Sequence, residues 1–192
     1  IVSEKVKSGE SAISLIEELR VGMDLVGQRY KSGDYFLAEL VYSSVIFNQA
    51  MTLIEPSLRD GAKMEPLGKI VIGTVKGDIH NLGKDIVSSL LRASGFEVHD
   101  LGVDVEPKRF VQGLEETRAP IVGLSCLITV GFEPLKATVQ AVIEAGLRDK
   151  VKIIIGGGVV TEFLRDYVRA DAHTTSAFEG VEICKRFVRE GR

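Results

Sequence analysis

Apolar residues recur at helical spacing through roughly the first third of the chain, and no segment there alternates as a strand would. The spacing predicts a helix over 12–19, which Ser11 can cap, and a second helical stretch over 23–30. A long third helix is predicted over 35–54, because Pro56 would end it. The amino-terminal part is therefore predicted to be all helical.

From Gly68 onward the pattern changes to short β-branched runs that alternate with helical stretches. The predicted strands cover 69–75, 96–100, 121–126, 151–155 and 171–174, and the predicted helices cover 82–94, 108–117, 133–145, 161–169 and 177–190. Five such units predict an α/β fold, a doubly wound parallel sheet with right-handed crossovers. We expect the flavodoxin-like strand order 2-1-3-4-5.

The change of pattern divides the chain into two predicted domains. Asp60-Gly61 and Pro66 lie between the last helical stretch and the first strand, and such residues typically form turns and linkers. We therefore expect a helical domain over 1–60, a linker over 61–67 and an α/β domain over 68–192.

Composition narrows the choice of partners. The net charge is −3 and the pI is about 5.7, and neither value favours binding to nucleic acid or to an anionic membrane. No apolar run approaches the roughly 18–20 residues of a membrane-spanning helix, and the charged start is not typical of a signal peptide. Cys126 and Cys184 lack CxxC spacing and predict reduced, packed thiols. These features predict a cytoplasmic protein that binds neither nucleic acid nor a membrane.

The most distinctive chemistry follows the first predicted strand. Asp78 and His80 lie on a strand-to-helix loop at the carboxyl end of that strand, where open α/β sheets bind their ligands. One imidazole nitrogen can bind a metal while the other donates to the carboxylate, which fixes the tautomer. Gly83 would let the backbone approach a large, flat group.

Two further loops fall at the carboxyl ends of strands. The third strand leads into a loop with hydroxyls at Ser125 and Thr129, which can form hydrogen bonds. The fourth strand ends in Gly156-Gly157-Gly158, which would leave a slot without side chains. At a switch point of the sheet the first and third loops come together, so these features predict one shared binding site.

These loops match a known pattern. Asp78, His80 and Gly83 form Asp-x-His-x-x-Gly, 123–129 reads Gly-Leu-Ser-x-Leu-x-Thr, and Gly156-Gly157 supplies the glycine pair after the next strand. Together they resemble the cobalamin-binding proteins, which include methionine synthase and the corrinoid proteins of microbial methyl-transfer systems. A short motif alone is weak, but three in matching strand contexts are specific.

The resemblance implies cobalamin bound base-off, with His80 as the cobalt ligand and Asp78 behind it. The nucleotide tail would enter a slot beside Ser125, Thr129 and the glycine pair. The other positions that the resemblance places at the cofactor are Asn81, Gly83, Leu127, Gly131, Thr174 and Ala177. At position 131 methionine synthase has a serine that continues the His-Asp relay, so a water or another hydroxyl would have to replace it here.

The resemblance extends over the helical domain, which in this family caps the methyl-bearing face of the corrin. By position, Tyr30, Leu37 and Val41 would cover the cobalt, although such an apolar stripe is also typical of an ordinary bundle core. His173 stands where the family often has a tyrosine, and either a place in the slot or simple packing would suit it. His99 has no partner that the sequence identifies.

The resemblance implies a methyl carrier of anaerobic one-carbon metabolism that is not catalytic alone. Its cofactor would occur as cob(I)alamin, cob(II)alamin and methylcobalamin. The implied partners are a substrate-specific methyltransferase, a methyltransferase for tetrahydrofolate or a similar acceptor, and a reductive activating protein. Overall resemblance favours O-demethylation of aromatic methyl ethers as the source of the methyl group.

Other functions use the same binding domain. A cobalamin-dependent isomerase subunit normally accompanies a large catalytic barrel, for which this chain has no room. A cobalamin-binding sensor usually adds a DNA-binding module, and the sequence contains no basic patch for one. A receiver-like domain without cobalamin would share the fold but leave the three loops unexplained.

Overall fold

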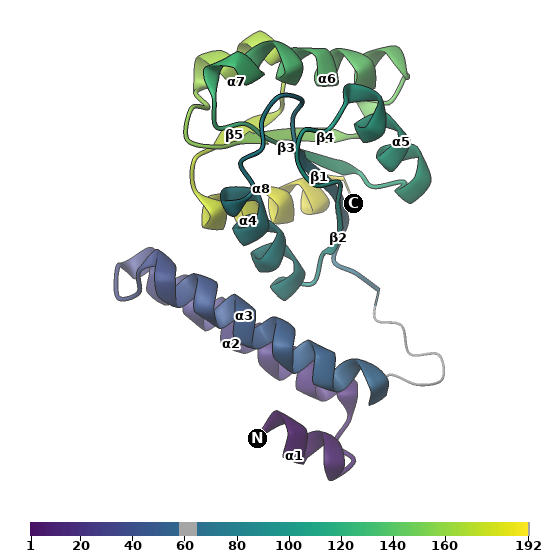
Figure 1. Cartoon of the computed structure of the whole chain (residues 1–192). Helices are drawn as coiled ribbons and strands as arrows, with labels where there is room; N and C mark the ends of the chain where they lie inside the picture. The colour runs from purple at the N-terminus through teal and green to yellow at the C-terminus, as the bar shows by residue number, and fades with distance from the viewer. Residues whose placement is uncertain (58–64, 192) are drawn as a thin grey trace.

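A five-stranded parallel sheet lies between two layers of helices in the computed structural model, which describes residues 1–57 and 65–191 (Figure 1). The strand order is β2-β1-β3-β4-β5, so the predicted doubly wound α/β fold and its flavodoxin-like order are confirmed. The strands are β1 (Lys69–Thr74), β2 (Glu97–Asp100), β3 (Ile121–Ser125), β4 (Lys152–Gly156) and β5 (Ala172–Thr174). The helices among them are α4 (Leu82–Ala93), α5 (Pro107–Thr117), α6 (Phe132–Glu144), α7 (Glu162–Val168) and α8 (Ala177–Glu190). Short 3₁₀ turns lie at Glu55–Ser57, Thr129–Gly131 and Arg148–Lys150.

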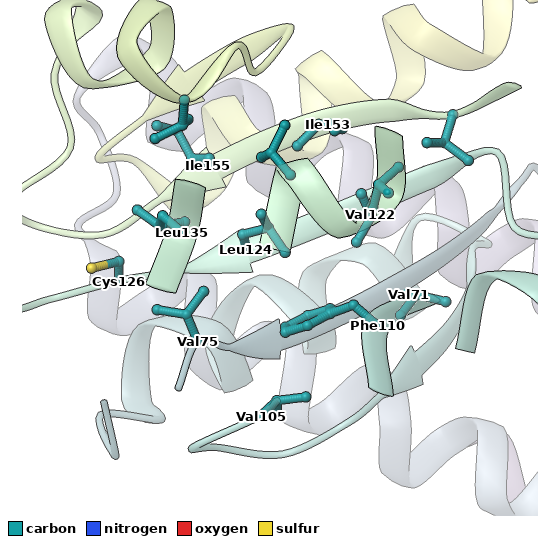
Figure 2. Packing of buried hydrophobic residues seen from close by; sticks show 14 of the residues in the cluster. Val71, Val75, Val105, Phe110, Val122, Leu124, Cys126, Leu135, Ile153 and Ile155 are labelled. Atoms are coloured by element: carbon teal, nitrogen blue, oxygen red, sulfur yellow. The ribbon is translucent and has the colours of Figure 1, made fainter. Parts of the chain in front are cut away.

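One face of the sheet is covered by α5, α6 and α7 (Figure 1). Alternate residues of the strands point to this face, because successive side chains of a strand point to opposite sides. Figure 2 shows Phe110 of α5 beside Val71 and Val75, with Leu135 of α6 over the neighbouring strands. Phe110 and Leu135 are fully buried, so this layer packs firmly on the face of the sheet opposite the amino-terminal helices.

The other face is covered by α4 and α8, which in turn contact the amino-terminal helices (Figure 1). Ile70 and Ile154 of the sheet belong to the same buried cluster as Leu91 of α4 and Phe187 of α8. Leu40, from the amino-terminal part, is 1% exposed within this cluster. The two parts of the chain therefore share one hydrophobic core.

The amino-terminal part contains α1 (Val2–Lys7), α2 (Ala12–Ser32) and α3 (Leu37–Ile54). The prediction of two separate helical stretches over 12–30 is wrong, because α2 runs through both without a break. It ends at Gly33, which has φ +84° and caps the helix in the left-handed conformation. Residues 58–60 of the predicted helical domain and 61–64 of the predicted linker lie outside the described residues, so the domain boundaries remain predictions.

Helix α3 differs from the sequence expectation in its composition. By length and apolar content it could cross a membrane, whereas no such run was expected. Its Leu40, Phe47 and Ile54 side chains are buried against other helices of the chain, but only 28% of the apolar segment is buried.

Candidate cofactor site

Asp78 and His80 form a tight pair on the loop between β1 and α4. The Asp78 side chain is completely buried, and its Oδ1 accepts hydrogen bonds from His80 Nδ1 at 2.7 Å and from the His80 backbone N–H at 3.0 Å. The proton on Nδ1 leaves the lone pair of Nε2 free, and half of the His80 side chain is exposed. The ring therefore has one nitrogen that could bind a metal.

The second oxygen of Asp78 is also satisfied. Its Oδ2 accepts a hydrogen bond of 2.6 Å from the backbone N–H of Leu127, on the loop after β3. Burial acts to raise the pKa of Asp78, but the hydrogen bonds from Leu127 and His80 outweigh it and hold the pKa below its usual value. The carboxylate is therefore ionised and acts only as an acceptor.

A backbone amide thus stands where the sequence suggested a water or a hydroxyl. A serine could not take that place at position 131, because a Cβ on Gly131 would lie 2.5 Å from Cys126 Sγ. The Cys126 thiol is fully buried and donates to the Ile128 carbonyl at 3.2 Å. Cys126 and Cys184 are both free and buried, as their spacing predicted. The packing of this loop therefore favours glycine at position 131, where methionine synthase has a serine.

A cavity of about 340 Å³ opens beside His80, between the carboxyl edge of the sheet and helices α4 and α8. It gathers residues from five segments that are far apart in the sequence, within 30–37, 70–87, 123–127, 154–158 and 174–184. The sequence-predicted residues that line it are Tyr30, Leu37, His80, Gly83, Ser125, Leu127, Gly156, Gly157, Thr174 and Ala177. Asp78 lies behind His80 and does not line it.

Four more of the predicted cofactor positions lie outside the lining of this cavity, and their contact with the cofactor stays a prediction. Val41 is half-buried on α3 and does not line the cavity. Asn81 is exposed at the start of α4, and Thr129 and Gly131 lie on the 3₁₀ turn after β3, all outside the lining. His173 of β5 does not line it either.

The floor of the cavity is apolar, and sequence reasoning missed it. The lining residues that were not predicted include Ile70, Ile72, Ile86, Val87, Leu124, Ile154, Gly180 and Cys184. Burial raises the pKa of the Cys184 thiol to about 12, so it stays protonated there. The alternation of β1 and β4 could have identified Ile70 and Ile154, since both point to the face that carries α4 and α8.

The side chain of His99 lies on β2. His99 Nε2 is a buried atom that lies 2.7 Å from Glu97 Oε1 without the geometry of a hydrogen bond, a neighbour that the sequence did not identify. It does not line the cavity.

These residues fit a corrin with a single protein ligand. Among residues 1–57 and 65–191 no group of three His, Cys, Asp or Glu side chains could hold a metal ion by itself. His80 offers one nitrogen, which suits a metal whose other positions a macrocycle fills. A Cβ placed on Gly83 would meet no atom within 4 Å, so a flat group has room above this loop. The apolar slot beneath can take an extended tail.

Comparison with known proteins agrees with this geometry. Two family models, both described as a B12 binding domain, match residues 68–186 and residues 1–55. The chain belongs to the cobalamin-binding corrinoid proteins of methyltransferase systems. Its cofactor is cobalamin.

Curated relatives match over nearly the whole chain. The dimethylamine corrinoid protein of Methanosarcina barkeri is 36% identical over 188 residues, which is 97% of this chain and 88% of that protein. Trimethylamine corrinoid protein 1 of Methanosarcina acetivorans is 36% identical and covers 94% of this chain and 85% of its own length.

Solved structures of corrinoid proteins share the fold. A cobalamin-binding protein from Desulfitobacterium hafniense DCB-2 is 39% identical, with a TM-score of 0.77 over 97% of this corrinoid protein and 88% of its own chain. The methanol:cobalamin methyltransferase complex MtaBC of Methanosarcina barkeri contains a chain that is 26% identical, with a TM-score of 0.86 over 96% of this chain and 70% of that one.

Proposed function

We propose that this corrinoid protein is a methyl carrier that binds cobalamin base-off, with His80 as the lower cobalt ligand. The observation that supports it most is the buried Asp78 carboxylate, which holds His80 Nδ1 at 2.7 Å and leaves Nε2 free beside the cavity. Cobalamin supplies a cobalt centre that can accept and release a methyl group.

The protein's own residues bind and orient the cofactor. His80 would set the position of the cobalt, and Asp78 would fix the tautomer and raise the basicity of the ring. The slot would hold the tail, since hydroxyl-bearing and apolar side chains both line it. No side chain of this chain is assigned to donor or acceptor chemistry, so the protein alone should turn over nothing.

The amino-terminal helices would shield the reactive face. Tyr30 and Leu37 line the same cavity as His80, and the Tyr30 ring lies 5.6 Å from the ring of Phe178 on α8. A Cβ on Gly27 would lie only 2.7 Å from Phe178, so α2 packs closely on α8. Exclusion of water protects a reactive centre, and transfer to a partner then requires this lid to move.

Removal of the lid's apolar side chains tests this role. The double variant Tyr30→Ala, Leu37→Ala should bind cobalamin nearly as well as wild type but lose the bound methyl group several-fold faster in light. Leu53→Ala is a matched control, because Leu53 is 49% exposed on the same helix against 46% for Leu37, and it lies outside the cavity. Equal photolysis rates in all three proteins would contradict the lid.

For the methyl donor we propose a methylated amine. The relatives described above are di- and trimethylamine corrinoid proteins, and none supports the O-demethylation expected from the sequence. Because the MtaBC match is a corrinoid chain in a complex with its methyltransferase, we further propose a substrate-specific methyltransferase, an acceptor methyltransferase and a reductive activating protein as partners. The free, buried thiols support a cytoplasmic location.

The carrier assay separates these possibilities. Purified protein loaded with reduced cobalamin is mixed with dimethylamine, trimethylamine or an aromatic methyl ether, with and without a purified methyltransferase for each donor. We expect a cobalt-methyl absorbance change only with an amine and its methyltransferase. Methylation by the protein alone would make it an enzyme, and methylation only from the ether would restore the O-demethylation hypothesis.

A further inference from the structure

The loop between β2 and α5, residues 101–106, does not line the cavity, yet it is bonded closely to the loop that carries His80. The backbone N–H of Thr74 donates to the Gly102 carbonyl at 2.9 Å, and the N–H of Val105 donates to the Thr74 carbonyl at 3.0 Å. Val105 also forms a parallel bridge with Val75. The 101–106 loop thus extends the edge of the sheet beneath the start of the His80 loop.

Within the 101–106 loop, Asp104 makes the contacts nearest in sequence to His80. Its backbone N–H donates to the Asp78 carbonyl at 2.9 Å, and its Oδ1 accepts from the Gly77 N–H at 2.8 Å. Lys76 Nζ lies 3.2 Å from the same carboxylate. One residue therefore fixes the backbone on both sides of the bond between Gly77 and Asp78, two residues before His80.

The backbone of Asp104 is itself unusual. Its φ is +53°, in the left-handed region that residues other than glycine rarely adopt, and aspartate and asparagine tolerate it best. The conformation directs the Asp104 N–H and carboxylate to successive residues of the His80 loop. This uncommon backbone conformation costs free energy, and it accompanies the three contacts that Asp104 makes with Lys76, Gly77 and Asp78.

A buried lysine, Lys84, contacts Asp100, the residue that precedes the 101–106 loop. Lys84 of α4 is 4% exposed, and its Nζ lies 2.5 Å from Asp100 Oδ2 at the end of β2. Asp100 Oδ1 accepts from the Gly102 N–H at 2.9 Å. On the opposite side of Gly102, Thr74 Oγ1 donates to the His80 carbonyl at 3.0 Å. A continuous set of bonds therefore runs from α4 through the 101–106 loop to His80.

We propose that the 101–106 loop is a clamp that positions His80 for cobalt, and that Asp104 is its main positioning residue. The inference rests on the proposed ligation of cobalt by His80. The clamp lies outside the cavity, so it would act on the orientation of the ligand and not on entry of the tail. Since the Asp104 side chain is 45% exposed, its removal leaves no buried unpaired charge.

The test distinguishes the effect of the Asp104 carboxylate from the effect of its backbone conformation. Asp104→Gly keeps a positive φ without strain but removes the acceptor, whereas Asp104→Asn keeps an acceptor and tolerates the same φ. Arg118→Gly is the matched control: Arg118 has φ +54° at the end of α5, is exposed and does not line the cavity. Each variant is loaded equally with Co(II) cobalamin, and its thermal unfolding midpoint is recorded.

The readout is the fraction of bound cobalt that shows coupling to an imidazole nitrogen in electron paramagnetic resonance. Because groups behind a metal ligand typically contribute 10- to 100-fold, Asp104→Gly should lower the ratio of His-bound to His-free cobalt about tenfold or more. Asp104→Asn should keep most of the coupling, and Arg118→Gly should match wild type.

Two results would overturn the clamp. Wild-type coupling in Asp104→Gly would show that the loop does not position His80, and a loss in Asp104→Asn as large as in Asp104→Gly would exclude the acceptor as the cause. If wild-type protein itself shows no imidazole coupling, ligation by His80 fails and the clamp fails with it. That outcome is seen before any variant is made.

Discussion

Replacement of Asp78 by asparagine is expected to weaken the bond between His80 and cobalt by 10- to 100-fold. Asp78 uses both oxygens, one for His80 and the other for the Leu127 N–H. Asparagine has a single oxygen, so its amide NH₂ must face either the two N–H groups of His80 or the N–H of Leu127. The Asp78 side chain is fully buried, so bulk solvent does not reach the lost acceptor.

The measurement is the Co(II)/Co(I) potential together with the Co(II) spectrum of equally loaded proteins. In Asp78→Asn the His-bound fraction should fall and the potential should shift. Stability should fall as well, by about 1–3 kcal/mol for one buried unsatisfied donor. Asp166→Asn, an exposed carboxylate on α7, serves as the control. A potential and a spectrum equal to those of wild type would show that the carboxylate does not tune the ligand.

The adjacent glycines Gly156 and Gly157 should give opposite results when they are substituted. A Cβ on Gly157 would lie 1.9 Å from the Cys126 carbonyl oxygen, and the residue has φ +132°. Gly157→Ala should therefore lower the free energy of unfolding by about 2–5 kcal/mol. Gly157 therefore serves the fold as well as the slot that the sequence predicted.

At Gly156 the nearest atom to an added Cβ is the Thr174 carbonyl oxygen at 3.6 Å, which is an ordinary contact. Gly156→Val should therefore fold normally and place its side chain in the slot. We expect at least tenfold weaker binding of cobalamin but unchanged binding of cobinamide, which lacks the nucleotide tail. Undiminished cobalamin affinity in Gly156→Val would show that the tail runs elsewhere.

The fold was accessible from the sequence because its signals are local and periodic. Apolar runs such as Ile70–Ile72 and Ile153–Ile155 mark strands buried on both faces, and turns separate them from amphipathic helices. Five repeats of this pattern leave few possible topologies. The loop motifs then fall at the carboxyl edge of the sheet, which is where His80, Ser125 and Gly156 meet around one cavity.

The parts that could not be predicted depend on three-dimensional contacts. The Leu127 amide that completes the Asp78 site has no side-chain signature, and the clash between Gly131 and Cys126 appears only once the loop is folded. The continuity of α2 follows from packing of Met23 and Val26 on the buried cluster between the sheet, α4 and α8, which outweighs the low helix propensity of Gly22.

The coordination of cobalt by His80 is tested most directly by electron paramagnetic resonance of the Co(II) protein. Samples are prepared with ordinary histidine, with ¹⁵N-labelled histidine, and as the variant His80→Ala. We predict coupling to one imidazole nitrogen that changes from a triplet to a doublet pattern on labelling and disappears in His80→Ala. A coupling pattern that is the same with and without the ¹⁵N label, or that persists unchanged in His80→Ala, would contradict ligation by His80.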